Sequence, residues 1–254
     1  MNDPIAKARW VLETKGTTGV PAEQLHDIAR QEDIRFIYRS LPNEPTLGGQ
    51  LLYKGKKKGI IINTLIDNAG RHNFTFAHEL GHYFLEHPAS YTLDGQFGFW
   101  CSTSDIGEGS RPREVEANHF AAELLMPEML FRLDMAGAPL DFALIGGLAN
   151  KYMVSKHASS NRILGLTREP CIIITSAGGT IETAKASRAA RPFLGQLKYI
   201  PQGCIADGVI LEGKRQNDFV ECDPQKWLGR RLASSKLYSC THGSNNHYMT
   251  ILRW

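Results

Sequence analysis

Apolar residues recur at helical or strand-like intervals along the first two thirds of the chain, and these intervals predict most of its elements. A spacing of three to four residues predicts helices over residues 3–14, 21–31, 68–87, 113–126, 139–152 and 155–166. Shorter apolar runs predict strands at 34–38, 51–53 and 59–62, with a hairpin turn over the basic segment 54–58. The glycines, prolines and serines between residues 88 and 112 are typical of a loop.

The pattern changes after Pro170, where alternating apolar residues replace the helical spacing. Residues 171–175 and 180–184 alternate as strands do, and Gly178 and Gly179 between them indicate a turn. We therefore predict an α+β protein with a domain boundary near residue 169. Residues 1–168 are expected to form a mainly helical domain with a small β-sheet, and residues 169–254 a smaller, β-rich α+β domain.

Composition and length agree with an ordinary globular protein. The 254 residues suffice for two domains that each bury a core, and 42% of them are hydrophobic and 22% charged. No apolar run approaches the ~20 residues of a membrane helix, and the first 14 residues lack the apolar stretch of a signal peptide. The five cysteines form no CxxC pair, which suits free thiols in a reducing compartment. We expect a cytoplasmic protein without a membrane partner.

Charge gives little reason to expect nucleic-acid binding. The formal net charge is +3, and residues 169–254 hold 11 Lys and Arg against 7 Asp and Glu, a balance of +4. A solvated basic face is the preferred interpretation of this excess, and an acidic partner or a nucleic acid is the alternative. The segment 154–166 lacks the density of basic residues that direct DNA binding requires.

The chemistry of the chain is concentrated in His78-Glu79-Leu80-Gly81-His82, an HExxH pattern within the helix predicted over 68–87. Residues at positions i and i+4 share one helix face, so two imidazoles can reach the same zinc ion. Glu79 then lies beside the open coordination position, where it can act as the general base towards water. Gly81 costs this helix about 1 kcal/mol relative to Ala, which indicates that another backbone passes close to it.

A catalytic zinc ion usually has three protein ligands, so one more is needed. The helix predicted over 113–126 is the best source, because Glu114 shares a face with Ala117 and Ala121. Small residues on that face allow close packing against the helix that carries the histidines, with Glu114 directed at the metal.

Three further residues are weighed as neighbours of the site. Glu116 lies about 200° round the helix from Glu114, so it cannot share the role of ligand. His119 is a rival nitrogen ligand, but it falls off the face of small residues. His87 follows the motif within the same predicted helix and is expected to lie beside the ligands or to face solvent.

The residue that assists zinc at the oxyanion is not determined by the sequence. Tyr83, Tyr91, His119 and His157 are the candidates.

These motifs resemble those of the ImmA/IrrE family of metallopeptidases. The likeness rests on FTFAHELGHYFLEH at residues 74–87 and EVEANHFAAELLMP at 114–127, with 148–162 similar to the helix pair that closes the domain. It covers roughly residues 20–168 and implies a zincin-like fold for the first domain. It also implies that Glu114 completes the zinc site of His78 and His82. Because many members have a single domain, residues 169–254 would be an added regulatory or recognition domain.

The resemblance further implies what the protein acts on. The family cleaves helix-turn-helix repressors, so we expect a zinc-dependent endopeptidase that hydrolyses an Xre-type transcriptional repressor and thereby derepresses stress or mobile-element genes. Manganese remains an alternative metal. The alternative function is that of a non-proteolytic regulatory protein, which would bind a repressor and use the metal structurally. Glu79 argues against this alternative, because a structural site has no need of a carboxylate beside an open position.

Overall fold

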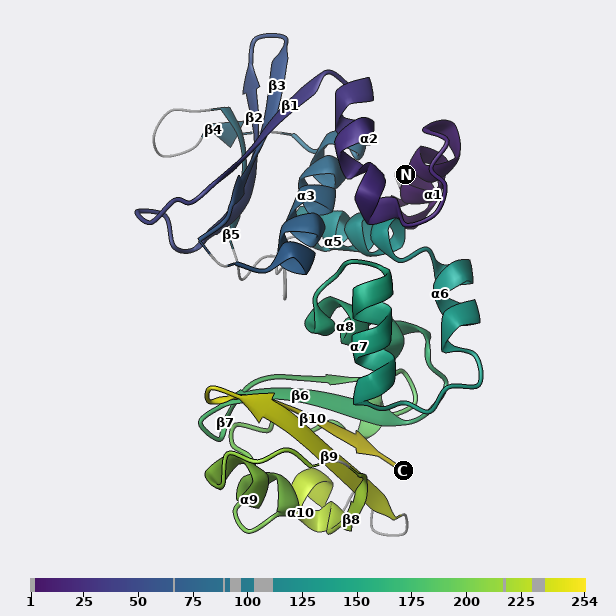
Figure 1. The fold of residues 1–254 in the computed structure, drawn as a ribbon, viewed down its shortest axis with the longest axis vertical. Coiled ribbons are helices and arrows are strands. Elements are labelled where there is room, and N and C mark those ends of the chain that lie inside the picture. Colours follow the sequence, from purple (N-terminus) through teal and green to yellow (C-terminus); the bar gives the residue numbers. More distant parts are fainter. Residues whose placement is uncertain are drawn as a thin grey trace. The chain divides into compact units, whose positions relative to one another are not determined.

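The computed structural model describes residues 3–65, 67–88, 90–91, 97–102, 112–216, 218–229 and 236–254. Its backbone divides into two compact units (Figure 1), residues 1–137 with 146–159 and residues 138–145 with 160–254. The division runs through α7 (Phe142–Lys151) and α8 (Lys156–Leu166), which confirm two of the predicted helices. Both units combine helices with a sheet, so the predicted α+β class is confirmed. In the described part of the chain, no helix has the length and apolar character to cross a membrane.

Capping residues begin the main helices of the first unit. Asp3 precedes α1 (Pro4–Thr14) and its carboxylate accepts a hydrogen bond from the amide of Ile5 at 2.9 Å. Asn68 precedes α3 (Ala69–Phe84), and its side chain accepts from the amide of Arg71. The other helices are η1 (Pro21–Gln24), α2 (Leu25–Gln31), α5 (Pro112–Leu125) and α6 (Glu128–Met135).

The hydrophobic pattern does not predict α6. Its apolar side chains do not form one buried stripe, because Phe131 is fully buried whereas Met129 and Leu133 are 78% and 70% exposed. A helical period is recognised from sequence over windows of about 11–18 residues, and α6 has only eight.

Five described strands form the sheet of the first unit, in the order β1-β3-β2-β5-β4. The first pair, β1 (Ile34–Arg39) and β3 (Lys57–Asn63), is parallel. Antiparallel pairs join the rest, namely β2 (Leu47–Lys54), β5 (Phe97–Ser102) and β4 (Ser90–Tyr91). The predicted strands are confirmed, as is the hairpin turn between β2 and β3, where Gly55 has a φ of 59°.

The loop predicted over residues 88–112 is wrong in part. Residues 90–91 and 97–102 form β4 and β5, while residues 92–96 and 103–111 lie outside the described structure. Phenylalanine and tryptophan within 97–102 favour a strand, and they outweigh the glycine that indicated a loop.

The helices of the first unit lie on one side of its sheet (Figure 1). Side chains alternate between the two faces of a strand, and Leu51, Ile60 and Ile62 are buried on the face towards α3. On that face a Cβ at Gly49 would come within 2.5 Å of the methyl group of Thr75 on α3. The sheet therefore holds α3, and with it the HExxH residues, at close range.

The second unit contains an antiparallel sheet in the order β7-β6-β10-β9-β8. Its strands are β6 (Cys171–Ala177), β7 (Thr180–Ala186), β8 (Val220–Cys222), β9 (Leu237–Ser244) and β10 (His247–Arg253), accompanied by η2 (Arg191–Phe193), α9 (Ile205–Leu211) and α10 (Pro224–Leu228). Gly178 and Gly179 form the predicted turn between β6 and β7, with φ values of 52° and 80°. The core of the unit packs Ile172, Ile174 and Leu252 of the sheet against Trp227 of α10.

Candidate metal centre

The HExxH residues lie in the buried middle of α3. His78, Glu79 and His82 are all at most 1% exposed. The spacing of four residues places the two imidazoles on one helix face, with their Nε2 atoms 3.0 Å apart. Helix geometry therefore brings together the pair of nitrogen ligands that the sequence predicts.

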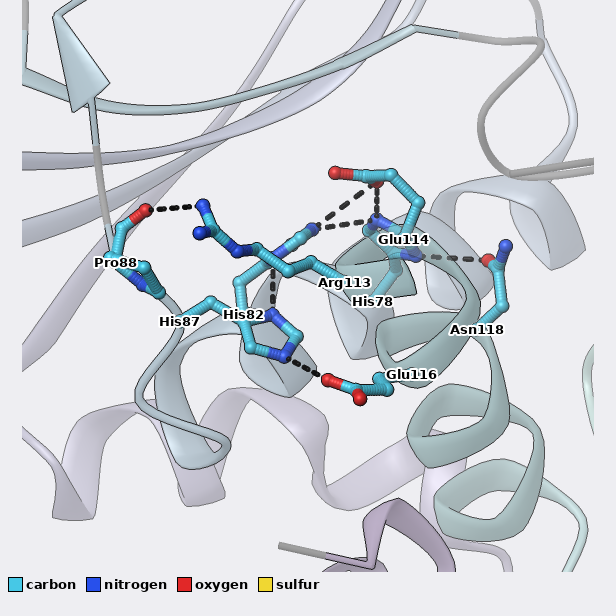
Figure 2. Close-up of polar contacts among 8 residues, drawn as sticks. All are labelled: His78, His82, His87, Pro88, Arg113, Glu114, Glu116 and Asn118. Atoms are coloured by element: carbon cyan, nitrogen blue, oxygen red, sulfur yellow. Dashed lines mark hydrogen bonds and ion pairs between the residues drawn. The ribbon is translucent and has the colours of Figure 1, made fainter. Parts of the chain in front are cut away.

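Glu114, in the first turn of α5, joins the two histidines (Figure 2). Its Oε2 lies 3.0 Å from Nε2 of His78 and 3.4 Å from Nε2 of His82. The three candidate ligand atoms are all within 4.8 Å of one another and belong to buried residues. Ligands on a tetrahedral zinc ion with bonds of 2.0–2.1 Å would lie about 3.3 Å apart. The observed separations of 3.0–3.4 Å fit that arrangement.

Close packing of α5 on α3 makes this convergence possible. A Cβ at Gly81 would lie only 3.2 Å from the Cα and from the carbonyl oxygen of Ala117. The sequence-based prediction that another backbone passes close to Gly81 is confirmed. Ala117 and Ala121 are fully buried, in agreement with the small-residue face that led to Glu114.

Asn118 orients His78 from one turn further along α5. Its Oδ1 lies 3.0 Å from Nδ1 of His78 (Figure 2). An amide oxygen is an acceptor only, so Nδ1 of His78 carries the proton and donates it to Asn118. The lone pair of His78 Nε2 is then directed towards Glu114 and the candidate metal position.

His87 contacts His82, the second candidate ligand, whereas the sequence left the position of His87 undecided. Its Nδ1 lies 2.9 Å from Nδ1 of His82, and its Nε2 lies 3.0 Å from Oε2 of Glu116. The side chain of His87 is 6% exposed, so the alternative that it faces solvent is wrong. Glu116 is absent from the group of candidate ligands in the described residues, as expected, but it reaches the site through His87.

The backbone conformation at the end of α3 explains why the side chain of His87 lies next to His82. The predicted helix extends to His87, but α3 ends at Phe84. Glu86 adopts a left-handed conformation with a φ of 55°, and the amide of His87 donates to the carbonyl of His82 at 3.1 Å. This is a Schellman cap, in which glycine is the usual left-handed residue. A glutamate there costs about 1–2 kcal/mol, and its side chain gives no sequence signal for the helix end.

Glu79 is the least satisfied group in the site. Both carboxylate oxygens are buried, and neither has a hydrogen-bond partner among the described residues. Burial, followed by the charge of Glu114, raises the pKa of Glu79 well above its ordinary value. The backbone of Leu51 lies nearby but outside hydrogen-bonding geometry, and it opposes these effects. A buried carboxyl group without partners normally costs stability. A metal ion with an associated water would supply the missing partner and lower the pKa, so Glu79 fits such a site.

The surroundings of His82 and Glu114 favour the protonation states that metal ligands require. Burial lowers the pKa of His82 from 6.5 to about 4, although Glu114 opposes this effect. His82 is therefore neutral at physiological pH, as a metal ligand must be. Burial alone would raise the pKa of Glu114, but the close approach of His78 and His82 outweighs burial and holds that pKa well below its ordinary value. Two imidazoles beside a carboxylate form a donor set that suits zinc.

The structure argues against Tyr83 and His119 as the residue that assists at the oxyanion. The hydroxyl of Tyr83 donates to Glu32 at 2.8 Å and accepts from Lys58 at 3.1 Å. Tyr83 is thus held by two charged partners. His119 is exposed on α5. The side chain of Tyr91 lies outside the described structure.

Sequence comparison identifies the family. Residues 29–164 match the peptidase M78 family, described as the IrrE N-terminal-like domain. Because this match covers more than half of the chain, the protein belongs to that family. The resemblance inferred from the two motifs is thereby confirmed. Among curated proteins, no sequence matches this chain.

A solved structure shares the fold. The chain resembles a Mycobacterium tuberculosis transcriptional regulator, with a TM-score of 0.61 and 14% sequence identity. The match covers all of this chain and 77% of the regulator. At this level of identity, the likeness concerns the fold alone.

Proposed function

We propose that this protein is a zinc-dependent endopeptidase in which His78, His82 and Glu114 hold the metal and Glu79 is the general base. The observation that carries the proposal is the carboxylate of Glu79, which has no hydrogen-bond partner among the described residues and is buried beside three converging candidate ligand atoms. A structural metal site would not require this buried carboxylate. Membership of a peptidase family supports the same function.

The buried residues around the site have defined tasks in peptide hydrolysis. A bound zinc ion would supply Lewis acidity, which polarises the peptide carbonyl and makes water more acidic. Glu79 takes a proton from the attacking water and passes it to the leaving amine. Asn118 keeps the proton on Nδ1 of His78, so that Nε2 remains available as a ligand.

We further propose that the substrate is a helix-turn-helix repressor of the Xre type, and that its cleavage derepresses stress or mobile-element genes in the cytoplasm. The family resemblance supports this substrate class. Residues 169–254 would then regulate the peptidase or recognise the intact repressor. All the proposed catalytic groups lie at or before residue 114, which leaves this later segment free for such a role.

The test uses the full-length protein with a helix-turn-helix repressor of the Xre type from the same organism. Wild type and Glu79→Gln are purified, their zinc and manganese contents are measured by mass spectrometry, and each is incubated with the repressor. Cleavage at one bond by the wild type alone, with equal metal in both proteins, would support the proposal. Loss of repressor function without cleavage would instead favour the non-proteolytic alternative.

A further inference from the structure

A chain of two contacts extends from the ligand His82 to the surface of α5 (Figure 2). The distance from Nδ1 of His82 to Nδ1 of His87 is 2.9 Å, and that from Nε2 of His87 to Oε2 of Glu116 is 3.0 Å. Exposure rises along the chain, because the side chains of His82, His87 and Glu116 are 0%, 6% and 46% exposed. The chain thus connects a buried ligand to a carboxylate in contact with water.

The hydrogen-bonding capacities of the three groups determine where each proton lies. A carboxylate only accepts, so the proton between Glu116 and His87 is on Nε2 of His87. In a neutral imidazole the other nitrogen is then an acceptor, so Nδ1 of His87 accepts a hydrogen bond from the N–H at Nδ1 of His82. His82 is left with its lone pair on Nε2, the atom that lies 3.4 Å from the Glu114 carboxylate.

The lone pair of His78 is also on Nε2, but a single hydrogen bond to Asn118 fixes it there. The amide oxygen of Asn118 accepts directly from its Nδ1, whereas His82 requires His87 as an intermediary. Both ligands therefore present Nε2 to the same point, each by a hydrogen bond on the opposite side of its ring. Metal-ligating histidines are commonly fixed in this way, and loss of such partners weakens metal binding.

We infer that His87 and Glu116 are positioning residues of the metal site, which fix the tautomer and ring orientation of His82 without touching the metal. This inference rests on the proposed metal site of His78, His82 and Glu114. The Schellman cap serves the arrangement, because the left-handed Glu86 directs the chain so that the amide of His87 binds the carbonyl of His82.

Two substitutions of similar size separate a hydrogen-bonding role from a packing role. His87→Asn places an amide oxygen near the position of Nδ1 and can still accept from His82, whereas His87→Leu cannot. Zinc affinity of the full-length protein is measured by competition with a chromophoric chelator. We expect His87→Leu to weaken zinc binding about 10- to 100-fold, and His87→Asn to recover most of the loss. The absorption spectrum of bound Co²⁺ should change for the leucine variant and stay close to wild type for the asparagine variant.

Glu116→Ala tests the outer contact and keeps the inference falsifiable if His87→Leu does not fold. We expect it to weaken zinc binding about 10-fold in the wild type but to have no effect in the His87→Asn background, where the contact no longer exists. Glu13→Gln removes an exposed carboxylate of α1 and is the control for loss of charge. Equal effects of Glu116→Ala in both backgrounds would overturn the inference.

His82→Ala distinguishes the failure of this inference from the failure of the metal site. If His82→Ala abolishes zinc binding while His87→Leu and Glu116→Ala leave it at the wild-type level, the site stands and the positioning role is wrong. If His82→Ala also binds zinc normally, the proposed site itself is wrong. Equal weakening by His87→Leu and His87→Asn would attribute the effect to packing and would likewise overturn the inference.

Discussion

Gly81 and Ala117 face each other so closely that the helices of the site meet at their backbones. A Cβ on Gly81 would lie 3.2 Å from the Cα and the carbonyl oxygen of Ala117. We predict that Gly81→Ala forces α5 away from α3 and lowers the free energy of unfolding by about 1–3 kcal/mol. Zinc affinity should fall as well, because Glu114 moves with α5. Denaturant unfolding and chelator competition measure the two effects.

Gly147→Ala is the matched control for that substitution. Gly147 is also within a helix, and a Cβ there would meet no atom within 4 Å. The same exchange should therefore stabilise the protein by about 0.5–1 kcal/mol through helix propensity. If both variants were equally stable and bound zinc alike, close packing at Gly81 would not matter for the site.

Glu79→Gln should separate catalysis from metal binding. The variant loses the base but no ligand, so metal content should stay the same while the rate of hydrolysis falls at least about 100-fold. Burial and the charge of Glu114 raise the pKa of Glu79, so its ionised form destabilises the folded protein at neutral pH. The variant without metal should accordingly unfold at a higher temperature than the wild type at pH 7. Normal proteolysis by this variant would exclude the mechanism.

Glu114→Gln should weaken zinc binding by more than about 100-fold, beyond the range typical of residues that only orient a ligand. The carboxylate is the one anionic member of the candidate ligand group, and a neutral amide is a poorer ligand for zinc. Glu116→Gln is the comparison variant. Its effect should be small, because the amide oxygen can still accept from His87. Metal content that drops for Glu116→Gln and not for Glu114→Gln would reverse the assignment.

Acid should destabilise the metal-free protein through His82. Burial lowers the pKa of His82 in the folded state from 6.5 to about 4. Above pH 6.5 His82 is neutral in both the folded and the unfolded state. Between pH 6.5 and about 4, His82 is protonated in the unfolded chain but not in the folded protein. The free energy of unfolding should fall by about 3 kcal/mol across that window. Denaturant unfolding in a chelator, with His82→Gln subtracted as the control, isolates this contribution. A difference that does not vary with pH would contradict it.

A chain truncated after residue 168 should still bind zinc, because the three candidate ligands lie at or before residue 114. Residues 160–168 belong to the second compact unit, and Ile163 and Leu164 are buried in the full-length protein. Truncation should expose them and lower solubility. Regulation or recognition of the intact repressor should change, while cleavage of a short peptide should persist. A folded, soluble truncated protein without a metal site would show that the later residues complete the site.

Local spacing was enough to predict the centre of the site, but not its surroundings. His78 and His82 are related by one helical turn, and the small residues of α5 indicated that Glu114 faces them. The contact between His87 and Glu116 was not predictable, since it depends on where α3 ends. That end is set by a glutamate in a left-handed conformation, a position at which sequence reasoning expects glycine.

The fold was predictable where apolar side chains mark a buried face. Residues 34–38 and 59–62 lie in strands β1 and β3 as predicted. Their parallel pairing was not evident, because register depends on contacts between distant segments. The helix α6 was not predicted because its eight residues are too few for a helical period to be recognised.

In the proposed site the ligands come from two helices that are separated in sequence, and this separation would impose an order on assembly. His78 and His82 would be able to bind an ion once one turn of α3 has formed. Glu114 is 36 residues beyond His78, so it arrives only when α5 has docked. Coordination by two imidazoles and coordination completed by a carboxylate are distinguishable in the spectrum of a bound Co²⁺ ion. The spectrum of a bound Co²⁺ ion can therefore report when α5 docks on α3 during folding.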